Sequence, residues 1–360
     1  MSRAAIATID LGALKHNLSI VRKNAPYSKI LAVIKANAYG HGLETMARAL
    51  TEADGFAVAH FEEAIAIREI YKDKPVVLLQ GFADEIELAL LLSLSIEPVI
   101  HSFYQIDILE KSELTDTTSV WLKVDTGMNR LGFAHADMLT AWQRLNAIES
   151  LKDRVKIMSH FANADDKNHP GTDDQISLFQ ILTKECNAEK SLANSSGLLH
   201  WPESQLDWVR PGIMLYGVSP FKNELEDNFD LMPVMTLKSR IIAINQIEKD
   251  EAIGYGHIWK AKKNTSIAVV GIGYGDGYPR HIKENTPVLI NNTRYQIVGR
   301  VSMDMICVEL NDDYKINVGD EVVLWGEGLP VEEIAIQAGT IAYELLCHVT
   351  ARVKFEAING

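Results

Sequence analysis

The sequence predicts an α/β protein in which an N-terminal (β/α)₈ TIM-like barrel is followed by a mainly β C-terminal domain. In the first two thirds of the chain, short apolar runs rich in β-forming residues alternate with helical patterns, which is typical of βαβ units and a parallel sheet. Beyond residue 235 the hydrophobic period becomes mostly two, which favours strands. The chain of 360 residues is long enough for a barrel of roughly 250 residues and an additional domain.

Eight strands are expected in the barrel, each an apolar run followed by a polar or glycine-rich turn. They lie at 30–35, 56–59, 76–80, 97–100, 120–125, 156–159, 192–194 and 208–210. Helical patterns separate most of these strands, for example at 41–50, 62–71, 84–94 and 136–148.

A polar, acidic run at 222–230, with Pro233 just beyond it, predicts the connection between two domains. A solvated loop inside one domain is the alternative interpretation. We expect a cofactor-binding barrel domain at 1–231 and a mainly β domain at 232–360, with a first strand near 4–10 that pairs with the β domain.

The β domain is expected to contain long strands and few helices. Strands are predicted at 235–247, 266–271, 287–298, 305–310 and 320–325, and helices at 331–338 and around 343–346. The pair Asn291-Asn292 lies between two apolar runs, which predicts a hairpin turn.

Composition excludes several classes of function. The formal net charge of −13 gives no electrostatic footprint for nucleic acid or an anionic membrane. No segment is long and apolar enough to span a membrane, and the amino end lacks the apolar stretch of a signal peptide. Cys186, Cys307 and Cys347 are widely spaced and form no disulfide framework, so we expect a reducing, cytoplasmic location.

Reactive groups of a (β/α)₈ barrel gather at the carboxyl ends of its strands. There the first strand has Lys35, the fifth has Lys123 with Arg130 on the loop above, and the sixth is followed by His160. Burial of Lys35 would lower its pKa, as a covalently reacting amine requires, whereas a lysine extending to solvent is the alternative. No spacing matches a recognised ligand pattern, so we expect no metal.

The loops after the seventh and eighth strands are the usual phosphate site of this fold. They contain Asn194, Ser195, Arg210, Gly212 and Ile213, and glycine allows the backbone to approach a phosphate closely. Ordinary turn glycines are the alternative. Together, an amine, a phosphate cradle and several cations at one barrel mouth indicate a phosphorylated aldehyde cofactor.

Six motifs make this chain resemble the alanine racemases, which are fold-type III pyridoxal phosphate enzymes, and the resemblance covers essentially the whole sequence. They are VIKANAYGHG at 33–42, DTGMNRLG at 125–132, VRPGI at 209–213, GYG at 254–256, GIGYGDGYPR at 271–280 and GRVSMDM at 299–305. The resemblance implies an enzyme that binds pyridoxal 5′-phosphate and interconverts L-alanine and D-alanine.

The resemblance implies that Lys35 is the Schiff-base lysine and one of two catalytic bases. Tyr255 resembles the second base, which in this family comes from the β domain of the partner subunit in a homodimer. Two bases on opposite faces are needed because racemisation removes a proton from one face of the α-carbon and returns one to the other. A free tyrosine has a pKa of about 10, so this role requires neighbouring cations or hydrogen bonds, for which His160 and Arg210 are candidates.

The remaining roles are likewise implied by the resemblance. Asn194 belongs to the cofactor site, and the phosphate ligands are Tyr39, Ser195, Gly212, Ile213 and Tyr343. His160 supports the cofactor ring and links Tyr255 to Arg210, which is the partner of the pyridine nitrogen. Arg130 and Met303 match the substrate-carboxylate site. Lys123 matches a position that can be carbamylated to orient Arg130, and Tyr274 and Asp304 resemble the gate of the substrate entryway.

Three other functions are considered. A racemase of broader specificity, acting on serine, lysine or arginine, would share this scaffold. A decarboxylase of basic amino acids would need a reactive cysteine at the site, whereas Cys307 and Cys347 lie in apolar runs and are expected to pack in the core. A non-catalytic cofactor-binding protein would lack the β domain.

Overall fold

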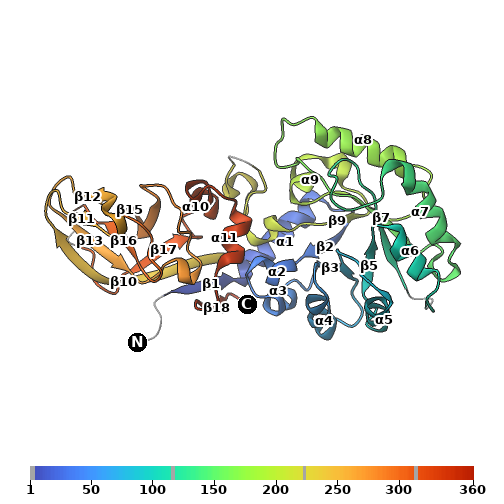
Figure 1. Ribbon diagram of the computed structural model, residues 1–360, viewed down its shortest axis with the longest axis horizontal. Helices are drawn as coiled ribbons and strands as arrows, with labels where there is room; N and C mark the ends of the chain where they lie inside the picture. The colour runs from blue at the N-terminus through green and yellow to red at the C-terminus, as the bar shows by residue number, and fades with distance from the viewer. Residues whose placement is uncertain (1–4, 115–117, 222–223, 312–314) are drawn as a thin grey trace.

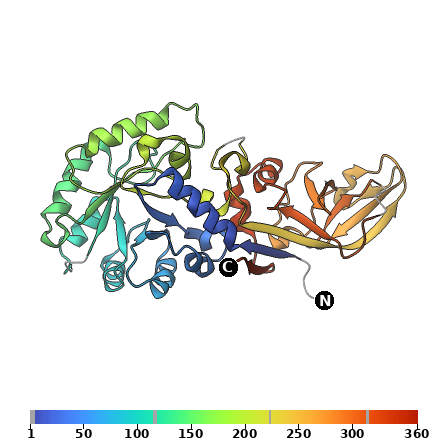
Figure 2. The ribbon, with the colours of Figure 1, turned by 180° about the vertical axis from the view of Figure 1, so that it is seen from behind.

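The computed structural model describes residues 5–114, 118–221, 224–311 and 315–360. Residue 4 of the expected first strand and residues 222–223 of the expected connection lie outside these ranges. Figures 1 and 2 show a barrel and a β domain side by side along the longest axis of the molecule.

A closed barrel of parallel strands forms the N-terminal part, as the sequence predicts. Most strand residues are buried, because helices cover the outside of the barrel and side chains fill the inside. The strands are β2 (Lys29–Val33), β3 (Gly55–Val58), β4 (Val76–Leu78), β5 (Glu97–Ile100), β6 (Val120–Lys123), β7 (Val155–Met158), β8 (Lys190–Ser191) and β9 (Trp208–Val209).

Helices surround this barrel (Figure 1). They are α1 (Leu11–Asn24), α2 (Lys35–Tyr39), α3 (Leu43–Ala49), α4 (Phe61–Ile70), α5 (Glu85–Ser93), α6 (Phe103–Leu109), α7 (His135–Ala147), α8 (Gly171–Thr183) and α9 (Ser195–His200). Short 3₁₀ turns are η1 (Glu149–Leu151), η2 (Pro202–Ser204), η3 (Ile213–Tyr216) and η4 (Glu226–Phe229). None of the helices in the described part of the chain is long and apolar enough to cross a membrane.

Several barrel strands are shorter than predicted, since those expected at 76–80 and 120–125 end at Leu78 and Lys123. The first and the seventh strands also differ. The first ends at Val33 and not at residue 35, because the backbone turns away before Lys35. The seventh lies at Lys190–Ser191, whereas the predicted segment 192–194 forms the loop that enters α9. In that loop Ala193 N–H donates to Ser204 O, which is not part of a strand.

The C-terminal part is mainly β, as predicted. Its strands are β10 (Met235–Ile247), β11 (Ala252–Ile253), β12 (Trp259–Lys260), β13 (Thr265–Val270), β14 (Pro287–Ile290), β15 (Thr293–Val298), β16 (Ile306–Glu309), β17 (Glu321–Trp325) and β18 (Lys354–Ile358). The sheet order is β13-β16-β15-β14-β17-β10, and β13 also pairs with β10, so these strands close on themselves. Strands β11, β12 and β18 were not predicted from the sequence.

The N-terminal strand β1 (Ile6–Asp10) belongs to this second sheet and not to the barrel. It pairs antiparallel with β10 and parallel with β18. Its last residue, Asp10, caps α1 by accepting a hydrogen bond from Ala13 N at 3.0 Å. The described part of the chain therefore begins in the β domain and passes directly from β1 into α1 of the barrel domain.

The predicted hairpin turn at Asn291-Asn292 is confirmed. Ile290 pairs with Thr293, which leaves a two-residue loop whose φ values are 49° and 60°. Positive φ at both positions is the type I′ turn, which matches the twist of paired strands.

Two helices and two 3₁₀ turns complete the β domain. They are α10 (Val331–Ala338), α11 (Ala342–His348), η5 (Tyr255–His257) and η6 (Tyr274–Asp276). Figure 1 shows α10 and α11 on the side of this domain that faces the barrel. Ser219 N–H donates to Glu332 Oε1 at 2.8 Å, which ties the end of the barrel domain to α10.

Gly217 provides a test of the packing between the barrel and the segment that leads to β10. Its φ is +77°, and a Cβ there would lie 1.8 Å from Met232 O. Gly339 has a φ of +69° with nothing within 4 Å of the same position. We expect Gly339→Ala to destabilise by about 1 kcal/mol through backbone strain, and Gly217→Ala by at least about 2 kcal/mol more. Thermal unfolding midpoints measure both, and equal losses would contradict the packing argument.

Candidate active site

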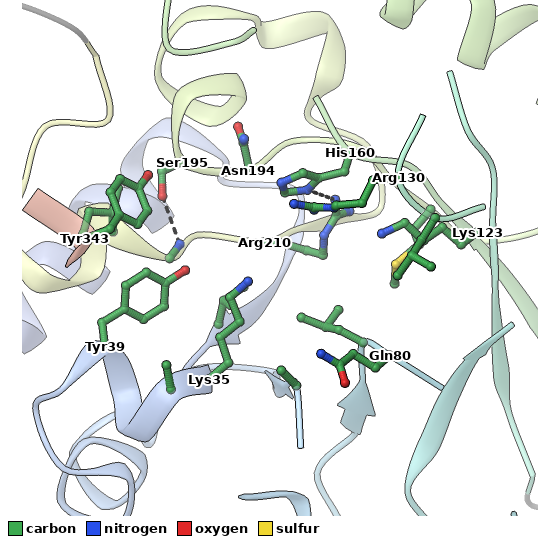
Figure 3. A pocket seen from close by; sticks show the side chains of 18 of the residues that line it. Lys35, Tyr39, Gln80, Lys123, Arg130, His160, Asn194, Ser195, Arg210 and Tyr343 are labelled. Carbon is green, nitrogen blue, oxygen red and sulfur yellow. Dashed lines mark hydrogen bonds between the residues drawn. The ribbon is translucent and has the colours of Figure 1, made fainter. Parts of the chain in front are cut away.

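One cavity of about 500 Å³ opens where the barrel strands end at their carboxyl termini. Figure 3 shows polar side chains from many of the strand-end loops pointing into it. The structure places in its lining the predicted residues Lys35, Tyr39, Lys123, Arg130, His160, Asn194, Ser195, Arg210, Gly212, Ile213 and Tyr343. The barrel therefore brings together residues that are far apart in sequence.

Lys35 begins a turn of left-handed backbone that positions it at the cavity. The next residues, Ala36 to Tyr39, have φ values of 54°, 53°, 54° and 52°. Such a conformation costs roughly 1–2 kcal/mol per non-glycine residue, so the surroundings must hold it. Asn37 N–H donates to Glu63 Oε1 at 3.0 Å, and Asn37 Oδ1 accepts from Leu43 N at 2.8 Å.

Two further contacts fix this turn. His41 Nδ1 lies 2.9 Å from Tyr39 O and 3.1 Å from Ala38 O, so its ring N–H bonds both carbonyls. At Gly40 a Cβ would lie 2.2 Å from Leu346 O, which brings the turn against α11. Lys35 and Tyr39 are consequently held by strained, tightly packed backbone and not by a regular helix.

Four cationic side chains line the cavity, namely those of Lys35, Lys123, Arg130 and Arg210, and no carboxylate is among its lining residues in the described chain. Burial, followed by the charge of Arg130, lowers the pKa of Lys35. Burial, followed by the charge of Arg210, lowers the pKa of Lys123 to about 8. The cavity is therefore suited to an anionic ligand, and it favours loss of protons from its lysines.

Arg210 is a buried part of the cavity wall and donates to neutral acceptors. Nη1 bonds Ser191 Oγ at 2.6 Å, Nη2 bonds Ser159 O, and Nη2 lies 3.4 Å from His160 Nδ1. Burial and the charge of Arg210 lower the pKa of His160 well below its usual range. Because an arginine only donates, we infer that neutral His160 accepts through Nδ1 and carries its proton on Nε2.

A cradle of donors lies on the opposite side of the cavity (Figure 3). Ser195 Oγ accepts from Gly212 N at 2.9 Å, which links the loops after β8 and β9. A Cβ on Gly212 would lie 2.6 Å from Tyr39 Oη, so only glycine allows this approach. Burial raises the pKa of Tyr39 and of Tyr343, so both phenols remain neutral hydrogen-bond donors.

Sequence reasoning missed several residues of the cavity. They are Val33, Ala36, Ala59, Leu79, Gln80, Leu131, Met158 and Cys347. Ala59 and Gln80 end predicted strands, so their places at the barrel mouth could have been expected. The prediction that Cys347 packs in the core is wrong, because its side chain is exposed on α11 and lines the cavity. Its spacing of four residues from Tyr343 on one helix face was the available signal.

Four predicted site residues do not line the cavity of their own chain: Tyr255, Tyr274, Met303 and Asp304 lie in the β domain. Tyr255 is 69% exposed and Met303 is 52% exposed. Backbone bonds from Tyr274 N to Ser302 O and from Gly275 N to Met303 O hold two of their loops together. The structure thus groups Tyr274 with Met303 on the β domain, apart from the barrel cavity.

Comparisons with known proteins give a consistent result. The family model for the N-terminal domain of alanine racemase matches residues 9–220, and the model for its C-terminal domain matches residues 234–357. The alanine racemase of Aeromonas hydrophila is 47% identical over 99% of this chain and 100% of its own. That of Shewanella woodyi is 49% identical over 96% of this chain and 97% of its own.

Solved structures that superpose on this chain are also alanine racemases. The biosynthetic alanine racemase of Pseudomonas aeruginosa superposes with a TM-score of 0.96 at 41% identity, covering 99% of this chain and 100% of that one. The alanine racemase of Bartonella henselae, solved with covalently bound pyridoxal phosphate, superposes with a TM-score of 0.89 at 31% identity over 99% of each chain.

The buried charge of Lys123 predicts a pH-dependent stability. Its pKa of about 8 in the folded chain lies below the ordinary value of 10.5. Below pH 8 the Lys123 amine is charged in the folded and in the unfolded chain, so its burial destabilises the folded state by the full amount. Between pH 8 and pH 10.5 the amine is neutral in the folded chain and charged in the unfolded chain, so the free energy of unfolding rises with pH. We expect Lys123→Met to stabilise the protein by about 3 kcal/mol at pH 7, and the gain to disappear towards pH 10.5.

Unfolding midpoints of Lys123→Met and the wild type, measured from pH 7 to 10, test this prediction. The buffer should be free of carbon dioxide so that Lys123 is not carbamylated. Lys156→Met is the matched control, because Lys156 Nζ is paired with Glu97 at 2.8 Å on the same barrel. Its loss leaves a poorly exposed carboxylate without its partner, so it should destabilise at pH 7. A destabilised Lys123→Met variant at pH 7 would contradict the argument.

Proposed function

This chain belongs to the alanine racemase family, a family of pyridoxal-phosphate-dependent racemases, and we propose that it interconverts L-alanine and D-alanine. The observation that carries the proposal is the cavity at the barrel mouth. It presents a desolvated amine, three further cations and neutral phenols to one space, without a lining carboxylate among the described residues. Such a cavity suits a phosphorylated aldehyde together with an amino acid's carboxylate.

The residues present fit pyridoxal phosphate. Lys35 is the amine that would hold its aldehyde carbon, because a lowered pKa favours the nucleophilic form. Ser195, Gly212 and Ile213, with the phenols of Tyr39 and Tyr343, would hold the phosphate, and Asn194 lines the same side and caps α9. When bound, the cofactor supplies a conjugated ring that accepts the electron pair left after proton removal from the α-carbon.

Arg210 and His160 would support the ring. An arginine cannot provide the carboxylate that keeps a pyridine nitrogen protonated, so we infer that the ring takes up less carbanion charge and that the α-carbon is reprotonated quickly. His160 accepts from Arg210 through Nδ1, which leaves its Nε2–H free to hold a neighbouring oxygen. This arrangement favours inversion at the α-carbon over transfer of the amino group.

Arg130 would bind the substrate carboxylate at the open side of the cavity, since a guanidinium matches a carboxylate in shape and charge. Lys123, which lines the same cavity, would orient Arg130 once its amine is carbamylated, because carbamate oxygens accept hydrogen bonds from a guanidinium whereas an ammonium only donates. In this role Arg130 fixes which face of the α-carbon is presented to Lys35.

We propose that the second base, Tyr255, reaches the cavity from a partner subunit in a homodimer. Its exposure on its own chain supports this, and Ile258, Tyr274, Met303 and Met305 are also exposed on the β domain. Tyr274 and Met303 lie on loops that are hydrogen-bonded to each other, and exposed apolar side chains that gather in one place are typical of an interaction surface. Lys35 Nζ would exchange a proton on one face of the α-carbon, and the phenol of the partner's Tyr255 would exchange one on the other.

In this dimer the partner's Met303 would complete the carboxylate site, and the partner's Tyr274 and Asp304 would narrow the substrate channel. We further propose that the enzyme works in the cytoplasm and supplies D-alanine for peptidoglycan. A racemase that also accepts serine, lysine or arginine is the alternative.

Incubation of the purified protein with single L-amino acids in D₂O tests the reaction. We expect L-alanine to become α-deuterated and to form D-alanine, and Lys35→Ala to lose this activity by at least about 10³-fold because the amine is removed. Activity confined to basic amino acids would overturn the substrate assignment. Release of carbon dioxide without racemisation would overturn the reaction type.

Mixing two inactive variants tests the shared site. Lys35→Ala and Tyr255→Ala should each be inactive alone. After subunit exchange in an equal mixture, half of the dimers are hybrids with one intact site of two, so about a quarter of the wild-type activity should return in a two-fold symmetric dimer. Racemase activity of the mixture measures this, and a mixture that stays inactive while exchanging subunits would show that Tyr255 acts within its own chain.

A further inference from the structure

Gln175 is a buried polar residue that the proposed reaction does not use. It lies on α8, outside the cavity lining, and is only 4% exposed. Figure 1 shows α8 on the outer layer of the barrel. A carboxamide in that place needs hydrogen-bond partners, because burial of an unpaired polar group is costly.

The partners of Gln175 come from two different strand-end loops. Nε2 donates to Thr126 Oγ1 and to His160 O, each at 3.0 Å. Oε1 accepts from Ala162 N at 2.9 Å. Both donor hydrogens and one acceptor position of the carboxamide are thus used, and together they bridge the loop after β6 to the loop after β7.

The loop after β6 carries Arg130, which is proposed to bind the substrate carboxylate, and the loop after β7 carries His160, which is proposed to support the cofactor ring. Thr126 lies four residues before Arg130 on the same loop, and Thr126 Oγ1 lies 2.9 Å from Ser159 Oγ. The carbonyl of Ser159 in turn accepts from Arg210. Hydrogen bonds therefore link Gln175 to the Thr126 hydroxyl and that hydroxyl to the Ser159 hydroxyl, while the backbone carbonyl of the same Ser159 accepts from Arg210. Gln175 also holds His160 at its backbone.

We propose that Gln175 is a positioning residue that sets the distance between Arg130 and His160, and thereby the place of the substrate carboxylate relative to the cofactor ring. The inference rests on the proposed racemase function and extends it to a residue that touches neither ligand. A carboxamide supplies the two donors used by Thr126 Oγ1 and His160 O and the acceptor used by Ala162 N. Glutamate in its ionised form would lose both donors, and asparagine is shorter by one methylene.

Steady-state kinetics of the cofactor-loaded enzyme separate positioning from simple stabilisation. A variant that only folds less well loses apparent kcat in proportion to its folded fraction but keeps KM, because KM does not depend on the amount of active enzyme. We expect Thr126→Val to raise KM for L-alanine about fivefold, with kcat within about twofold of wild type, since it releases the Arg130 loop but leaves the bonds of Gln175 to His160 and Ala162 in place.

Gln175→Leu should raise KM for L-alanine at least as much and should also lower kcat, because it releases His160 as well. The double variant should show no further rise in KM beyond that of Gln175→Leu, since both substitutions break the same link. Gln175→Glu keeps the shape of the side chain and an acceptor for Ala162, and it should raise KM about fivefold if Gln175→Leu does not fold.

Asn17→Leu is the matched control. The Asn17 carboxamide is 0% exposed and also donates twice and accepts once, to Leu215 O, Met232 O and from Met232 N. Its loss should lower the unfolding midpoint and leave KM for L-alanine within about twofold of wild type.

The outcomes distinguish the two hypotheses. If the wild-type enzyme does not racemise alanine, the proposed function fails. If it does, and Thr126→Val and Gln175→Glu both keep the wild-type KM, Gln175 has no positioning role. Additive effects on KM in the double variant would also overturn the inference.

Discussion

The structure depends on four positive side chains that surround one cavity without a lining carboxylate in the described chain. A buried cation without a counter-ion is expensive, and the protein lowers the cost in two ways. Arg210 is satisfied by neutral oxygens and an imidazole nitrogen, and the lysines have lowered pKa values. The remaining positive potential favours anions at the barrel mouth, in a chain whose overall charge of −13 would otherwise repel them.

The geometry of this cluster is maintained by backbone that would be unstable in isolation. The left-handed turn after β2 is held by Glu63, by the ring of His41 and by contact with α11. The loops after β6 and β7 are joined by one buried carboxamide. The turn after β2 and the loops after β6 and β7 are both fixed by hydrogen bonds or close contacts from neighbouring elements, which hold side chains more precisely than a flexible loop would.

The fold was largely predictable because its signals are periodic. Residues 235–247 and 331–338 form a strand and a helix with the predicted limits. Most of the predicted cavity residues lie at or after barrel strand ends, whereas Tyr39 and Tyr343 were implied only by the family resemblance. The features that were not predicted depend on contacts between residues far apart in the sequence. The polar pair Lys190-Ser191 pairs as a strand only because both neighbours are present, and the left-handed turn has no pattern of its own. Gln175 resembles any polar residue on an amphipathic helix until its partners are known.

The division of the site between two domains has a physical consequence. Within one chain Arg130 lines the barrel cavity and is exposed to solvent, whereas Tyr255 is exposed on the other domain. Water weakens electrostatic interactions, so a cation cluster acts most strongly on a proton transfer when the cavity is covered. In a two-fold symmetric dimer each chain would cover its partner's cavity and supply its phenol in the same contact. Association would then provide the second base and the exclusion of water together, so that assembly and activity are coupled.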